Sequence, residues 1–108
     1  MTHGTTKGAL SPARKRLLEL LQATNFGTVE NLIVRDGEPV VVDPAPRVVR
    51  SIKLGAENGP RPEFVLADFV LREPVVEMFE HLSRIGNGTV AIQVRHGLPC
   101  QIIVEQPV

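Results

Sequence analysis

The sequence predicts an α+β fold in which two helix-plus-hairpin repeats share one antiparallel sheet, in the order α-β-β-(β)-α-α-β-β. A segment with apolar residues at helical spacing occurs twice, over residues 12–23 and 74–85. Each is followed by a strand, a glycine-containing turn and a second strand, over residues 27–42 and 88–104. Neither unit could bury its apolar face alone, so the two units are expected to cover each other.

Length and composition indicate one compact domain. The chain has 108 residues, of which 43% are hydrophobic, and neither half could form a stable core by itself. We predict a single domain over residues 10–108, made of two repeats, 10–54 and 63–108, joined by a loop at 55–62. Residues 1–9 lack apolar periodicity and are expected to be a disordered tail.

Charge and cysteine content restrict the class of function. Lys plus Arg and Asp plus Glu number 12 each, so no overall field favours nucleic acid or an anionic surface. No apolar run is long enough to cross a bilayer and no secretory leader is recognisable, which favours a soluble cytoplasmic protein. The single cysteine, Cys100, excludes an internal disulfide framework, and its place on the inward face of a strand predicts a core residue.

Both predicted helices have recognisable starts. Ser11 is a suitable N-cap and Pro12 suits the first helical position, and a leucine-rich stripe follows as far as Leu21. Pro74 marks the start of the second helix in the same way. The apolar stripe of the second helix consists of Val75, Met78, Phe79, Leu82 and Ile85.

The alternation of apolar residues sets a register for the second hairpin. All of these residues stay on one face if Val94 pairs with Leu98 around a three-residue loop, Arg95–Gly97. In that loop Gly97 would occupy the left-handed bulge position, and His96 would tolerate an unusual backbone angle. The predicted inward set is Val90, Ile92, Val94, Leu98, Cys100, Ile102 and Val104.

The first hairpin is expected to follow the same register, with Gly37 closing a loop at Arg35–Gly37. Its first strand, however, is one residue longer than that of the second hairpin. Because a one-residue shift would turn Val29 to the wrong face, we predict a β-bulge near Glu30-Asn31. The expected inward pairs are Val34 with Glu38 and Leu32 with Val40, and Val42 follows on the same face.

The middle of the chain is less regular. Asp43–Pro46 contains two prolines and predicts a break, after which Arg47–Leu54 alternates as a third strand. Phe64–Leu71 is apolar almost throughout, and its length does not separate a short helix from a strand. Pro62 and Glu63 favour a helix, and the segment could belong to the core or to an interface.

Both units carry a short motif: an apolar helix, a strand that opens with Gly-Thr-Val, a tight turn and a return strand. In the first unit the residues are Leu17–Leu21, Phe26-Gly27-Thr28-Val29, Asp36-Gly37 and Val40–Val42. This motif resembles a family of very short uncharacterised bacterial proteins, a domain of unknown function. The second unit departs from it with Asn87 and His96 at the phenylalanine and aspartate positions. The resemblance implies a duplicated module and no particular activity.

The sequence offers no convergent set of catalytic or metal-binding side chains. Glu77 and His81 are four residues apart on the second helix, a spacing that can present two ligands to one metal, but no third ligand accompanies them. Neither a nucleophile elbow nor a phosphate-binding glycine loop occurs. We therefore expect no enzyme, and no bound metal or cofactor.

Seven basic residues could bind phosphates, and they support an alternative function as a nucleic-acid-binding regulator that uses a basic helix and a hairpin tip. No second recognition helix accompanies the first, and the chain has 4 Phe but neither Tyr nor Trp for base stacking. A solvated basic edge is the simpler explanation. The residues are Arg14, Lys15, Arg16, Arg35, Arg47, Arg50 and Lys53.

The leading functional hypothesis is a non-catalytic small module that acts through protein association, with a homodimer as the expected form. It is favoured by the repeated apolar hairpin face, the high Val and Ile content and the lack of a polar cluster. The expected partner is a second copy or another protein, and no membrane is involved.

Overall fold

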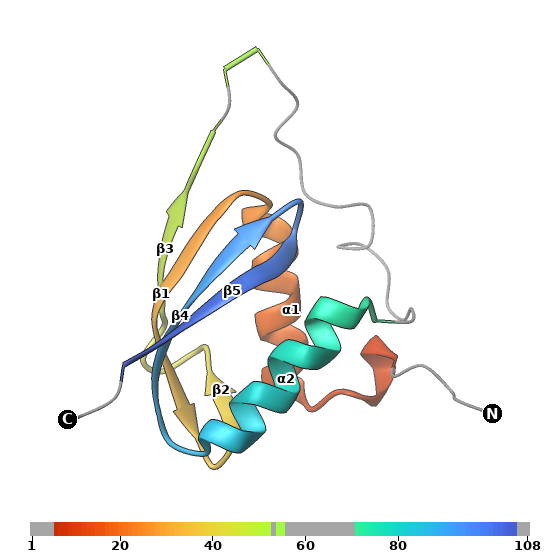
Figure 1. Ribbon diagram of the computed structural model, residues 1–108, viewed down its shortest axis with the longest axis vertical. Coiled ribbons are helices and arrows are strands. Elements are labelled where there is room, and N and C mark those ends of the chain that lie inside the picture. Colours follow the sequence, from red (N-terminus) through yellow and green to blue (C-terminus); the bar gives the residue numbers. More distant parts are fainter. Residues whose placement is uncertain (1–5, 53, 56–70, 106–108) are drawn as a thin grey trace.

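The computed structural model describes residues 6–52, 54–55 and 71–105. Within these ranges helices alternate with hairpins, and the predicted α+β class with an antiparallel sheet is confirmed (Figure 1). The elements are the 3-10 helix η1 (Lys7–Ala9), the helices α1 (Pro12–Thr24) and α2 (Glu73–Ile85), and the strands β1 (Gly27–Arg35), β2 (Glu38–Val40), β3 (Arg47–Arg50), β4 (Gly88–Arg95) and β5 (Leu98–Glu105).

One five-stranded sheet joins the two halves of the chain. Its strand order is β2-β1-β4-β5, and β3 pairs with β1 beyond the end of β2. Both α1 and α2 lie on the same side of the sheet (Figure 1), and the side chains between these layers form a single core. The core residues of the helices are Leu17, Leu18, Leu21, Val75, Met78, Phe79 and Leu82, and those of the strands are Val29, Leu32, Val34, Val90, Ile92 and Val94.

Two predicted segments fall largely outside the described residues. The loop predicted at 55–62 is described only at Gly55, and of the apolar segment Phe64–Leu71 only Leu71 is described. The side chain of Leu71 is buried and belongs to the core. The segment therefore contributes at least one residue to the packing beneath the helices.

Both helices begin where proline predicts. Arg14 N donates to Ser11 Oγ at 3.2 Å, so serine caps α1, and Pro12 occupies the first helical position. α2 begins at Glu73, one residue before Pro74. Proline at this position costs no hydrogen bond, because the first N–H groups of a helix have no partner within it.

Part of the segment predicted as a tail is ordered. Lys7–Ala9 forms η1, and the Lys7 side chain is only 6% exposed, with its Nζ 3.8 Å from Glu19 Oε2. The aliphatic stem of a lysine can be buried while its ammonium group stays near a carboxylate. Three residues of the segment predicted as a tail therefore form a 3-10 helix.

Strands β1 and β4 form the centre of the sheet and carry the predicted β-bulge. Their antiparallel pairing shifts register between Val29 and Leu32, and Asn31 has a φ of 57°. Glu30 and Asn31 therefore lie opposite a single residue of β4, which returns Val34 to the same face as Val29. Val29 and Leu32 are both 0% exposed. The prediction of a bulge near Glu30-Asn31 is confirmed.

The second hairpin closes with a two-residue turn, so the predicted three-residue loop is wrong. Val94 pairs with Pro99 and not with Leu98. His96 and Gly97 have φ values of 56° and 73°, and two successive positive φ angles give the type I′ turn, whose twist matches that of paired strands. Histidine adopts this region more readily than most residues, so one glycine is sufficient for the turn.

The register predicted for the first hairpin is wrong for the same reason. Val34 pairs with Pro39 and not with Glu38, and the turn consists of Asp36 and Gly37, with φ values of 53° and 77°. The pair that closes the turn, Arg35–Glu38, is hydrogen-bonded, and the next pair, Val34–Pro39, has no backbone hydrogen bonds between its members. Proline is tolerated opposite Val34 because its missing N–H is not needed there.

β2 is short, and the chain then leaves β1. Val40 pairs with the residue after Leu32, not with Leu32 as predicted, and Val42 is 65% exposed instead of facing inward. The proline-containing break was predicted correctly. β3 resumes the pairing with β1 but ends at Arg50 and not at the predicted Leu54.

A second bulge removes Cys100 from the core. The pairing of β4 with β5 shifts register after the Val94–Pro99 pair, and Cys100 is the extra residue. Its side chain is exposed, and its Sγ donates to Gln93 O at 3.4 Å. The prediction of a core cysteine is therefore wrong. The errors at the turn and at the bulge cancel, which leaves Ile102 on the inward face as predicted.

Each hairpin turn docks on the end of the helix from the other half. Gly37 N donates to Gly86 O at 2.7 Å, and Gly97 N donates to Asn25 O at 2.8 Å. Gly37 is buried, and a Cβ on it would lie 3.3 Å from Ser83 Cα. Glycine is required at position 37 both for its positive φ and for its close approach to α2.

Replacing Gly37 with alanine tests the docking of the first turn. Gly37 and Gly55 both have a φ of 77°, but a Cβ at Gly55 would have nothing within 4 Å. We expect Gly55→Ala to lower the free energy of unfolding by about 1 kcal/mol through backbone strain, and Gly37→Ala to lower it by about 2 to 3 kcal/mol because the Cβ also crowds Ser83. Urea unfolding followed by circular dichroism measures both, and equal losses would contradict the docking.

Candidate functional site

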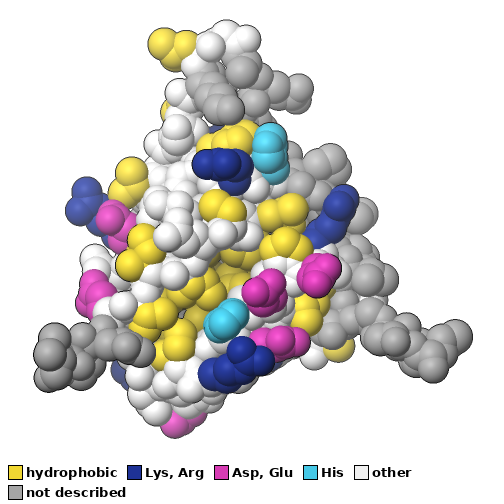
Figure 2. All heavy atoms as spheres, viewed as in Figure 1, with side chains coloured by type: hydrophobic (Ala, Val, Ile, Leu, Met, Phe, Trp, Pro, Cys, Tyr) yellow, Lys and Arg dark blue, Asp and Glu magenta, His cyan; other side chains and the backbone are white. Residues whose placement is uncertain are grey.

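An open groove lies between α2 and β5. Its volume is about 830 Å³, which is within the range of ligand and side-chain binding sites. Figure 2 shows hydrophobic side chains running across this face, between acidic, basic and histidine side chains. We call it the α2–β5 groove. Its apolar lining includes Met78, Ile85, Leu98, Pro99, Ile102 and Val104.

The local sequence explains which side chains reach the groove. In α2, Glu77, His81 and Arg84 recur at three- and four-residue spacing, so they share one exposed face of the helix beside the buried stripe. In β5, Ile102 and Val104 are two residues apart and point to the side of the sheet that carries the helices. The groove therefore has an apolar floor and a polar rim.

The polar groups on the rim do not converge on one point. His81 Nε2 lies 3.8 Å from Glu77 Oε1, and Arg84 Nη2 lies 4.0 Å from Glu80 Oε2, and both are exposed pairs within α2. Such pairs contribute little to stability. Nowhere in the part of the chain that the structure describes do three His, Cys, Asp or Glu side chains come together as metal ligands. The groove can receive apolar surface, and its rim can orient a partner.

Strand β5 is an edge strand that lacks the usual protection. It spans Leu98–Glu105, and after Pro99 it contains no proline, lysine or arginine. Ile103 and Val104 are 46% and 37% exposed. Beyond the bulge at Cys100 the edge is uninterrupted over Gln101–Glu105, and an edge with exposed β-branched residues pairs readily with a further strand.

The opposite edge of the sheet is protected. It consists of two short strands, β2 with 3 residues and β3 with 4, which a proline-containing break separates. Pro39 lies within β2, and Arg47 and Arg50 begin and end β3. Short strands, prolines and cationic side chains are devices that prevent pairing at sheet edges. Among the described strands, β5 alone offers an edge segment, Gln101–Glu105, without them.

The sequence carries a signal for this edge in the run Ile102-Ile103-Val104. A strand with one buried face should alternate between apolar and polar residues. Gln101 and Glu105 satisfy this alternation on the outer face, and Ile103 between them does not. The outward Ile103 therefore leaves exposed apolar surface at the edge of the sheet.

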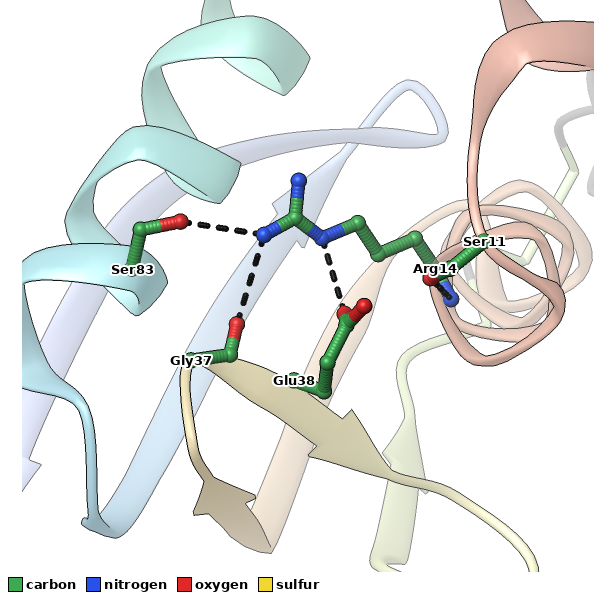
Figure 3. A network of polar contacts seen from close by, with 5 residues as sticks. All are labelled: Ser11, Arg14, Gly37, Glu38 and Ser83. Atoms are coloured by element: carbon green, nitrogen blue, oxygen red, sulfur yellow. Dashed lines mark hydrogen bonds and ion pairs between the residues drawn. The ribbon is translucent and has the colours of Figure 1, made fainter.

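Arg14 is a structural residue and not part of an exposed basic surface (Figure 3). Its Nε donates to Glu38 Oε2 at 2.9 Å, and its Nη2 donates to Ser83 Oγ at 3.0 Å and to Gly37 O at 3.4 Å. The guanidinium carbon also lies 5.3 Å from the ring centroid of Phe79. These contacts join α1, the first hairpin and α2, so the guanidinium is committed to the fold.

The other basic residues do not form one cluster. Arg35 ends β1 at the turn, whereas Arg50 pairs with Gly27 at the start of β1. At about 3.3 Å per residue, the 9 residues of this strand separate its ends by about 26 Å. Lys15 and Arg16 lie on α1, Arg47 Nε is 3.6 Å from Glu30 Oε1, and Lys53 lies outside the described residues.

No protein-family model, curated protein or solved structure matches the chain. Within the described ranges, no helix has the length and apolar character needed to cross a membrane. The function must therefore be argued from the fold and its surfaces.

Substituting Arg14 tests whether it belongs to the fold. Arg14→Ala should lower the free energy of unfolding by about 2 kcal/mol, because it removes three hydrogen bonds and the contact with the Phe79 ring that join α1, the first hairpin and α2. Arg16→Ala, its control on the exposed side of α1, should change this value by less than about 0.5 kcal/mol. Chemical denaturation of both variants gives the values. Equal effects would mean that the network in Figure 3 does not stabilise the protein.

Proposed function

We propose that this protein is a non-catalytic module that acts by protein association, and that its functional form is a homodimer joined along the β5 side. The contrast between the two edges of the sheet carries the proposal. β5 presents an edge that is continuous over Gln101–Glu105 and exposes Ile103 and Val104, whereas β2 and β3 are short and are separated by a proline-containing break. An open edge beside an apolar groove is a surface that a partner chain would cover.

Covering this surface is favourable through the hydrophobic effect. Complete burial of a Val, Leu or Ile side chain contributes about 1.5 to 3 kcal/mol relative to full exposure. Ile103 and Val104 are each more than a third exposed, and a two-fold interface covers both residues in both copies. Rim residues such as Glu77 and Arg84 would give the interface a hydrated border.

The same contrast favours a closed dimer over an open chain of subunits. An interface made by the same edge of both copies is isologous, so it is complete once two copies have joined. The remaining edge of each copy is the protected one formed by β2 and β3. If both edges were open, strands could add at either side and subunits would assemble into fibres.

We infer that the two halves of the chain are copies of one helix-hairpin unit. Each helix has 13 residues and precedes a strand that opens with Gly-Thr-Val. The backbone bonds from Gly37 to Gly86 and from Gly97 to Asn25 are reciprocal between the halves. The resemblance of the motif to short uncharacterised bacterial proteins supports the same inference. On this interpretation, the pairing of β1 with β4 is an internal example of association between two such units.

Nucleic-acid binding is the alternative function, and the geometry supports it less well. Arg14 is committed to contacts within the fold, and Arg35 and Arg50 lie at opposite ends of β1. Binding to duplex backbone needs several cations arranged along one surface. The basic residues of this chain are divided, so a solvated edge accounts for them.

The molar mass in solution tests the proposed homodimer. Light scattering at micromolar concentration should give twice the 11.8 kDa of the chain. Ile103→Lys should weaken association by at least about 30-fold, equivalent to about 2 kcal/mol, because a charge in the middle of an edge opposes strand addition. Val49→Lys is the matched control, since Val49 is 44% exposed but lies on the protected edge. This variant should remain dimeric.

A wild-type protein that stays monomeric at high concentration would contradict the proposal. A dimer that Ile103→Lys leaves intact would show that a different surface joins the copies. Retarded migration of duplex DNA at low salt, abolished in an Arg16→Ala and Arg35→Ala double variant, would favour the alternative function.

A further inference from the structure

We propose that the second copy adds to β5 as an antiparallel strand, about a two-fold axis through Ile103, so that the two sheets become one continuous sheet. This inference rests on the proposed homodimer and deepens it by specifying the strand, its direction and its register. Three properties of β5 support it: the backbone groups that point outward, the side chains that are exposed, and the positions at which the edge is interrupted.

The outward backbone groups of β5 follow from its pairing with β4. In an antiparallel ladder, residues of hydrogen-bonded pairs point their N–H and C=O groups at the neighbouring strand, and residues of the intervening pairs point them away. The Arg95–Leu98 pair closes the two-residue turn and is therefore hydrogen-bonded. Hydrogen-bonded and intervening pairs alternate along β4 from Arg95, so Ile92 and Val90 belong to intervening pairs. Their partners, Ile102 and Val104, therefore direct N–H and C=O groups outward.

With a two-fold axis through Ile103, the outward backbone groups of one copy face those of the other copy. Ile102 then pairs with the partner's Val104, and Val104 pairs with the partner's Ile102, which gives two symmetry-related hydrogen-bonded pairs. On the axis, Ile103 faces the partner's Ile103 in a non-hydrogen-bonded pair, the kind in which side chains approach most closely. A register displaced by one residue would place the inward Ile102 beside the partner's outward Ile103.

The same register covers the exposed apolar side chains and matches the polar ones. Ile103 and Val104, which are 46% and 37% exposed, gain apolar neighbours across the new strand pair. On the outer face, Gln101 lies opposite the partner's Glu105, where the amide can donate to the carboxylate. An axis through Val104 would instead place Glu105 opposite the partner's Ile103.

The start of β5 limits the length of the new pairing. Pro99 has no N–H to donate, and the bulge at Cys100 increases the local twist and turns the edge away. Pairing is therefore confined to Gln101–Glu105, which contains the exposed apolar run. A short ladder with one allowed register gives a specific dimer.

Disulfide formation across the axis tests the register. Two variants in a Cys100→Ser background, which lacks the exposed native thiol, are compared: Ile103→Cys and its control on the same face, Gln101→Cys. In the proposed dimer the two copies of residue 103 have Cα atoms about 4.5 Å apart, which a disulfide can bridge. The two copies of residue 101 are about 13 Å apart, which is too far.

Under mild oxidation, Ile103→Cys should form a covalent dimer at least tenfold faster than Gln101→Cys, as measured on non-reducing gels. Light scattering of the reduced variants is recorded in parallel. If the reduced proteins are dimeric but Gln101→Cys cross-links as fast as Ile103→Cys, or neither cross-links, the proposed register is wrong and the homodimer stands. If the reduced proteins and the Cys100→Ser parent are monomeric, both the register and the homodimer are wrong.

Discussion

The antiparallel pairing of β1 with β4 is the constraint on which the rest of the structure depends. It joins the two halves at the centre of the sheet and holds the inward residues of both strands beneath α1 and α2. The bulge at Asn31 is essential to it, because without the extra residue either Val29 or Val34 would face away from the helices. The docking of each turn on the opposite helix and the contacts of Arg14 follow from this junction.

The same pairing of β1 with β4 leaves two outer edges, and only one of them is protected against pairing with a further strand. The outer side of β1 is divided between β2 and β3, because the chain leaves the sheet over residues 41–46. The outer side of β4 is followed by β5 along its length, with one bulge at Cys100. An edge broken by prolines and arginines is protected, and a continuous edge containing Ile102-Ile103-Val104 is not. The surface for which we propose a function therefore arises where the two halves differ.

The sequence predicted the features that depend on a repeating pattern of apolar residues. Helical spacing located both helices, and counting faces around Val29 located the bulge. Both turns were predicted one residue too long, because backbone φ, not hydrophobicity, distinguishes the two loop lengths. In the second hairpin the bulge at Cys100 hides this error, since it restores the predicted alternation at Ile102. The candidate site depends on contacts between distant segments. Arg14 was grouped with exposed cations because its neighbours in the sequence are basic, whereas Glu38, which binds it, lies 24 residues away. Likewise, the topology of the sheet decides which strand forms its edge.

Amide hydrogen exchange at Ile102 and Val104 tests the central claim most directly. The N–H groups of both residues point away from β4, so water reaches them in an isolated copy and a strand from a second copy would protect them. In isotope-labelled protein at a concentration that favours the dimer, we predict slow exchange at both amides and faster exchange on dilution. Exchange at the rate of an unprotected amide at every concentration, while the amide of Ile103 stays protected by β4, would contradict the claim.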